Sequence, residues 1–146
     1  MKRNLLIFSL ALLAGFSSCK KDSKTGGLDV NPVYDDPLWS AVEAKGDYAY
    51  TMTAVFDLPA DLKANVSDGD RMAAFVGDEC RAVSSPNNGL FILNIVGTSD
   101  EESALNFKYW NASTHYLYEF DGSVTYVPDL IYGVVDEPIL FICNQL

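Results

Sequence analysis

Apolar and polar residues alternate in short runs from residue 39 to the C-terminus, which is the pattern of strands that bury one face. In residues 48–58, the positions predicted to face the core are Tyr48, Tyr50, Met52, Ala54 and Phe56. Residues 105–110 also alternate, and they place Lys108 and Trp110 on the outward face. Residues 90–96 are almost continuously apolar, which predicts a central strand buried on both faces.

Turn signals separate these runs and set the fold class. Asp68-Gly69-Asp70 precedes a predicted hairpin whose strands are residues 71–76 and 80–84, joined by Gly77-Asp78-Glu79. Strands recur at the spacing typical of sandwiches and barrels, and no segment has a convincing helical period. We therefore predict an all-β fold for residues 39–146, an antiparallel β-sandwich of about 7–9 strands.

The predicted hairpin carries a thiol beside a guanidinium group, at Cys80 and Arg81. Strict alternation sends Cys80 to the buried face with Ala82, and it sends Arg81 to the surface, where it would pair with an acid. A nucleophilic Cys needs a nearby base or cation that lowers its pKa. Because the single imidazole, His115, falls at a loop exit, we predict no catalytic residues and no enzyme activity.

The N-terminus has the plan of an export signal: basic residues, a short apolar run and then small residues. The apolar run, residues 5–13, is too short to span a bilayer. Phe16-Ser17-Ser18-Cys19 resembles the bacterial lipoprotein box, although Phe16 and Ser18 depart from its commonest form. The resemblance implies that residues 1–18 are a signal peptide and that Cys19 is acylated. A plain secretory signal with an incidental Cys is the alternative.

Residues 19–38 are polar and contain Gly and Pro without any period, which predicts a flexible tether between the acylated Cys19 and the sandwich. Acyl chains hold a protein on a lipid bilayer without a spanning helix. The start of the tether, Cys-Lys-Lys-Asp, is similar to the signal that sends some Bacteroidetes lipoproteins to the outer face of the cell. We therefore expect a lipid-anchored, surface-exposed protein of the bacterial outer membrane.

The charge of the chain excludes one class of partner. Without residues 1–18, 8 Lys and Arg oppose 20 Asp and Glu, a net charge of −12. Such a field repels nucleic acid, so we predict no nucleic-acid binding.

A longer stretch resembles a module that recurs in exported Bacteroidetes proteins. Its parts are SDGDRMAAFVGDECRAV, the strand LFILNIVG, an acidic turn TSDEES and the hairpin LNFKYWNASTHYLYEF, and the resemblance covers roughly residues 39–127. The resemblance implies a β-sandwich domain of secreted or surface proteins and brings no catalytic residues with it. Ala82, Trp110 and Asn111 depart from the residues that are usual in the module, which leaves any ligand preference open.

Cys80 and Cys143 remain once Cys19 is acylated, and in an oxidising envelope they could form a disulfide or stay as two buried thiols. Asp68 and Asp70, with Asp61, are weak candidates for Ca²⁺ ligands, but they lack the spacing of an EF-hand loop. One His and no thiol cluster argue against zinc. We predict no metal and no cofactor.

Adjacent acids could serve a glycosidase, which needs two carboxyl groups across a cleft. All of these acids fall at predicted turns or in the tether: Asp35-Asp36, Asp78-Glu79, Asp100-Glu101-Glu102 and Asp136-Glu137. A small hydrolase is therefore the least favoured function.

Outward aromatic residues give the main functional signal. Trp110 beside Lys108, together with Trp39, could bind a sugar ring or anchor a protein, although either Trp could instead cover a neighbouring strand. We therefore predict a non-catalytic binding module for a glycan or an envelope protein. The alternative is a structural subunit of a surface assembly joined by strand addition.

Overall fold

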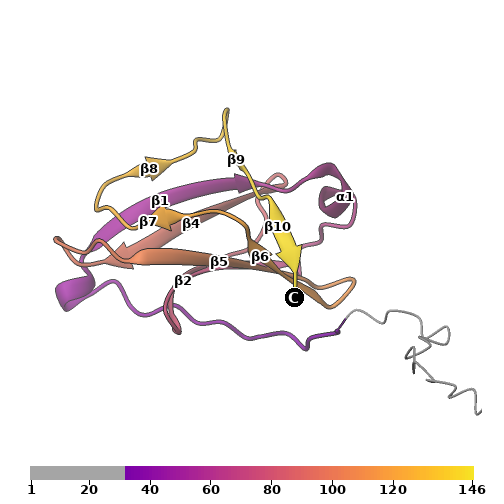
Figure 1. Cartoon of the computed structure of the whole chain (residues 1–146), viewed down its shortest axis with the longest axis horizontal. Coiled ribbons are helices and arrows are strands. Elements are labelled where there is room, and N and C mark those ends of the chain that lie inside the picture. The colour runs from indigo at the N-terminus through magenta and orange to yellow at the C-terminus, as the bar shows by residue number, and fades with distance from the viewer. Residues whose placement is uncertain (1–31) are drawn as a thin grey trace, which may run out of the picture. The chain divides into compact units, whose positions relative to one another are not determined.

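The computed structural model describes residues 32–146, which fold into two packed β-sheets (Figure 1). The predicted signal peptide, the acylated Cys19 and most of the predicted tether lie outside the described residues. None of the helices in the described part is long and apolar enough to cross a bilayer.

Sheet A has four strands in the order β4-β1-β8, with β9 also paired to β1. Its strands are β1 (Tyr50–Asp57), β4 (Leu90–Gly97), β8 (Ile131–Tyr132) and β9 (Ile139–Leu140). β1 and β4 are antiparallel, whereas β8 and β9 run parallel to β1.

Sheet B has the order β10-β6-β5-β2-β3, with β7 paired to one end of β5. Its strands are β2 (Arg71–Val76), β3 (Glu79–Ser84), β5 (Ala104–Asn111), β6 (Tyr116–Phe120), β7 (Val124–Thr125) and β10 (Cys143–Gln145). All of its pairs are antiparallel. Residues 32–146 also contain two single-turn helices, η1 (Gly46–Tyr48) and α1 (Ala60–Lys63).

The predicted all-β sandwich is confirmed. Residues 32–146 form ten strands rather than the predicted 7–9, because four segments of only two or three residues also pair with the sheets. The alternation predicted for β1 is confirmed at Met52, Ala54 and Phe56, which are buried in the core. It is wrong at the start of the run, because Tyr50 is exposed and Tyr48 lies in η1 before the strand. The prediction for residues 90–96 is wrong in one respect. β4 is the last strand of sheet A rather than a central one, so its apolar run buries one face in the core and leaves Asn94 exposed.

Aromatic side chains fill the space between the sheets. Phe56 of β1 makes edge-to-face contacts with Phe107 of β5, at 4.8 Å between centroids, and with Phe141, at 5.6 Å. Tyr109 and Phe91 meet in the same way from β5 and β4. Each such ring buries a large apolar area, and edge-to-face pairs add about 0.5–1.5 kcal/mol beyond that burial. The core therefore lies between β1 and β4 on one side and β2, β5 and β6 on the other.

The segment before η1 crosses the outer face of sheet B (Figure 1). Residues 32–38, which composition assigns to the flexible tether, are therefore part of the folded domain. We call residues 32–45 the N-terminal strap. The backbone N–H of Tyr34 donates to the carbonyl of His115 at 2.8 Å, and that of Val42 donates to the carbonyl of Cys80 at 3.0 Å. These bonds hold the strap against both ends of the sheet.

A buried carboxylate fixes the entry to β2. Asp70 is fully buried, and its oxygens accept hydrogen bonds from Ser67 Oγ at 2.8 Å, Tyr109 Oη at 2.5 Å and the Ala112 N–H at 3.0 Å. Burial and the bond to Asp70 raise the pKa of Tyr109 well above its usual range. Asp70 thereby joins the turn before β2 to the hairpin loop between β5 and β6.

We expect Asp70→Ala to lower the free energy of unfolding by about 3 kcal/mol, because it leaves buried donors without an acceptor. Urea denaturation of the full chain measures this loss. Asp68→Ala, at an exposed position two residues earlier, should change the free energy by less than about 0.5 kcal/mol. Equal losses in the two variants would contradict the role assigned to Asp70.

Candidate functional site

Arg81 lies on a β-bulge that reverses the side predicted for it. The register pairs Ala74 with Ala82 and Phe75 with Cys80, so Arg81 has no partner on β2. An extra residue of this kind breaks the alternation of a strand and re-aims the side chains beside it. Arg81 is therefore buried, with 6% of its surface exposed, and the predicted surface position is wrong.

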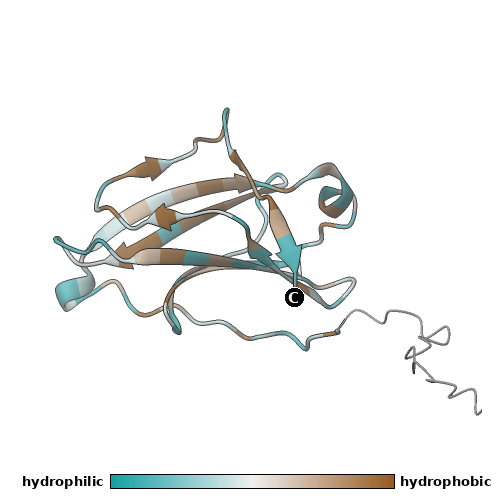
Figure 2. Ribbon diagram, viewed as in Figure 1, coloured by the Kyte–Doolittle hydropathy of each residue, from teal (hydrophilic) through white to brown (hydrophobic). Residues whose placement is uncertain are grey.

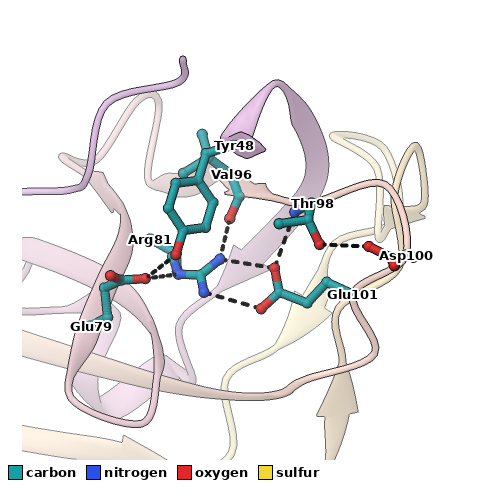
Figure 3. A network of polar contacts seen from close by, with 7 residues as sticks. All are labelled: Tyr48, Glu79, Arg81, Val96, Thr98, Asp100 and Glu101. Atoms are coloured by element: carbon teal, nitrogen blue, oxygen red, sulfur yellow. Dashed lines mark hydrogen bonds and ion pairs between the residues drawn. The ribbon is translucent and has the colours of Figure 1, made fainter. Parts of the chain in front are cut away.

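The guanidinium group of Arg81 spans the gap between the edge strands of the two sheets (Figure 3). From β3, its Nη1 donates to the Val96 carbonyl of β4 at 3.1 Å and to Glu101 Oε2 at 3.0 Å. Nη2 donates to Glu101 Oε1 at 3.1 Å, and Nε lies 2.5 Å from Glu79 Oε1. The ring of Tyr48 covers the group at 4.4 Å. We call these five residues the arginine clasp.

Arg81 and Glu101 form the central ion pair of the clasp, and each stabilises the ionised form of the other. Burial alone would raise the pKa of Glu101, but hydrogen bonds from Arg81, Ser103 and the Thr98 N–H hold it below its ordinary value. Burial alone would lower the pKa of Arg81, and the hydrogen bonds and charge of Glu101 raise it instead. Because both side chains are ionised and engaged, Glu101 is not available as a general acid.

A glycine makes room for this arrangement. A Cβ on Gly97 would lie 2.4 Å from Tyr126 Cζ and 2.7 Å from Glu101 Oε2, closer than any real contact. The end of β4 therefore approaches the Tyr126 ring and the Glu101 carboxylate only without a side chain.

Cys80 and Cys143 are two free thiols, which is the second of the two alternatives that the sequence leaves open. They lie on β3 and β10, the two edge strands of sheet B, and four strand spacings place them roughly 19 Å apart. A disulfide needs Cα atoms within about 7 Å. Burial raises the pKa of Cys80, and burial raises that of Cys143 to about 11, which disfavours a reactive thiolate at either position.

The acid pairs lie at turns, in the strap or in the clasp. Asp136 and Glu137 are exposed in the loop between β8 and β9, and Glu79 and Glu101 are held by Arg81. Within residues 32–146, no group of three or more His, Cys, Asp and Glu is placed to hold a metal ion. Of the weak Ca²⁺ candidates, Asp70 is engaged by buried donors and Asp61 and Asp68 are exposed.

The three predicted ligand residues meet on the outer face of sheet B, where Trp110 lies under the strap and Trp39 belongs to the strap itself. Trp110 is buried, and its Nε1–H donates to the Tyr34 carbonyl at 3.0 Å. Trp39 is half-buried and meets the ring of Phe75 edge-on at 5.6 Å, and Lys108 Nζ lies 5.6 Å from the centroid of that ring. The prediction of an exposed aromatic platform at Trp110 is therefore wrong.

The outer face of sheet A, by contrast, exposes apolar side chains around β8 and β9. Ile131 pairs with Thr53 and Leu140 pairs with Asp57, so both point away from the core on the outward side of β1. Their exposed fractions are 63% and 50%. Figure 2 shows β8 as a hydrophobic strand at this edge. Sequence reasoning missed the surface because residues 128–137 have no clear period.

The loop between β8 and β9 adds two more exposed side chains, Val134 and Val135. Val134 and Glu137 exchange two backbone hydrogen bonds, which fold the loop back on itself. Gly133 begins the loop with a φ of +79°, and a Cβ there would lie 2.7 Å from the Val55 carbonyl oxygen. We call Ile131, Val134, Val135 and Leu140 the open face.

The open face borders a shallow groove of about 460 Å³ lined by Gly133, Val134, Glu137, Pro138, Ile139 and Leu140. Three exposed acids, Asp129, Asp136 and Glu137, lie in the same stretch of chain, and no Lys or Arg follows Lys108 in the sequence. The surface is therefore apolar at its centre and negative at its border.

No protein-family model matches the chain, and no curated protein or solved structure matches it significantly.

We expect Glu101→Gln to lower the free energy of unfolding at pH 7 by about 3 kcal/mol, because it leaves Arg81 buried beside a neutral side chain. Glu102→Gln, one residue further and exposed, is the matched control. Because the folded state lowers the pKa of Glu101, the stability from the pair is present above pH 4.5 and is lost as the pH falls through the folded pKa.

The gap in stability between the wild-type chain and Glu101→Gln should therefore narrow from pH 7 towards pH 3. Urea denaturation across this pH range measures it. A gap that stays constant would show that the ion pair does not carry the difference.

Proposed function

We propose that the protein is a bacterial lipoprotein, anchored in the outer membrane through an acylated Cys19 and acting as a non-catalytic binding module for an envelope protein. The anchor rests on the sequence of residues 1–19 alone. The binding role rests on the open face, where four large apolar side chains point into solvent on an otherwise acidic chain. Exposed apolar patches with polar borders are typical of interaction sites.

Protein is favoured over glycan as the partner because of where the aromatic rings lie. Sugar binding by stacking needs an exposed flat ring, and Trp110 is buried under the N-terminal strap. The open face offers branched aliphatic side chains, which suit packing against another protein. A hydrolase is disfavoured because Arg81 forms ion pairs with both acids of the clasp, Glu79 and Glu101.

For the anchor, we expect metabolic labelling with a clickable palmitate analogue to mark the full-length protein. Cys19→Ser should abolish the label and release the protein from the membrane fraction. Cys143→Ser should retain the label, because that thiol lies within the sandwich. Labelling that survives Cys19→Ser would refute the lipoprotein assignment.

For binding, p-benzoylphenylalanine in place of Ile131 should give a discrete cross-linked product in intact producing cells. The same probe in place of Val33, an equally exposed position on the strap, should not give that product. The cross-linked product should be larger than the uncross-linked protein by the mass of a second protein, and that added mass should be sensitive to protease. The absence of any adduct at position 131 would count against a binding role for this face.

A further inference from the structure

We propose that the open face docks a cationic, amphipathic protein surface, with apolar side chains on Ile131, Val134 and Leu140 and Lys or Arg side chains on the acids around them. The inference rests on the proposed binding function and names the chemistry of the partner. It has two independent supports, the exposed apolar area and the charge around it.

The apolar contact explains why these side chains point outward. Ile131, Val135 and Leu140 each expose half or more of their surface, although Met52, Ala54 and Phe56 on the other side of β1 are fully buried. Burying exposed aliphatic side chains on binding is favourable in proportion to the apolar area removed from water. Covering the face would therefore yield a substantial favourable free energy, and the groove beside Val134 and Leu140 gives a partner side chain a place to enter.

The charge selects a basic partner. Asp129, Asp136 and Glu137 are exposed beside the open face, and the last 38 residues contain no Lys or Arg. Lys63 of α1 forms an ion pair at 2.7 Å with Asp57, the partner of Leu140 on β1, so its charge is already matched there. Complementary charge speeds encounter and suppresses partners of like charge.

The same charge argues against a second copy of this chain as the occupant. Residues 32–146 carry 5 Lys and Arg against 18 Asp and Glu, a net charge of −13. Two copies that met through this face would place their acids against one another. Anionic lipid head groups are disfavoured for the same reason.

The probe is a designed helical peptide of about 14 residues, with Leu on one face and Lys on the other, compared with the same peptide carrying Glu in place of Lys. A helix is the element that naturally covers the open face of a sheet. Fluorescence anisotropy with the full mature protein measures binding. Ile131→Thr with Leu140→Thr removes the apolar contact, Asp136→Asn with Glu137→Gln removes charge, and Val33→Thr is the control.

We expect the Leu–Lys peptide to bind at least about tenfold more tightly than the Leu–Glu peptide. Each double variant should weaken binding by about tenfold, and the charge variant should also reduce its salt dependence. Val33→Thr should change affinity by less than about twofold. Circular dichroism tests whether each variant is folded. If the Thr variant does not fold, the charge variant still tests the proposal.

Other results would overturn the proposal. Equal binding of both peptides would remove the charge argument, and equal binding by the Thr variant would show that the peptide is attracted only by overall charge. Concentration-dependent dimers abolished by Ile131→Thr would make a second copy the occupant. If the Cys19→Ser protein binds anionic vesicles and Ile131→Thr abolishes that binding, the occupant of the open face is a lipid membrane. A protein adduct at position 131 without peptide binding would leave the proposed function standing and refute this inference alone.

Discussion

A buried guanidinium group determines how the two sheets meet along one side of the sandwich. Burying Arg81 is costly unless its charge is paired, and Glu101 and Glu79 supply the opposite charge while the Val96 carbonyl accepts one hydrogen bond. Desolvation offsets much of the attraction in such a pair, so its main effect is to select one arrangement. Only with β3 and β4 side by side does Arg81 have its partners, and this fixes which edges of the two sheets are adjacent.

The two outer faces of the sandwich differ as a consequence of where the chain runs next. The N-terminal strap leads into η1, whose last residue, Tyr48, lies on the Arg81 guanidinium group. To reach this position the strap crosses the outer face of sheet B. It covers Trp110 and contacts Phe75 on the way. Among residues 32–146, no segment covers Ile131 and Leu140 on sheet A in this way, so the apolar surface lies there. The binding surface and the clasp are thus linked through chain geometry.

The sequence predicted the burial of a side chain correctly where strict alternation decides which way it points. It failed where a residue departs from that alternation. The sandwich and the inward side chains of β1 follow from a period of two, and so does the outward direction of Trp110. Burial of Trp110 depends on a strap some 70 residues away in sequence, which no local pattern encodes. Arg81 was misplaced because the bulge adds one residue to β3. The open face was missed because its two-residue strands are too short to have a period.

The edges of the two sheets favour docking on a face over strand addition. β3 is bonded to the strap at Cys80, and β4 is held beside β3 by Arg81, so neither edge has a free row of backbone groups at these points. On the far side of sheet A, the loop of residues 133–138 interrupts the edge between β8 and β9, and β10 has only three residues. Short and interrupted edges are how proteins prevent pairing with other chains. A partner that avoids these edges can still reach the outward side chains of Ile131 and Leu140, and packing on that face needs no unpaired backbone.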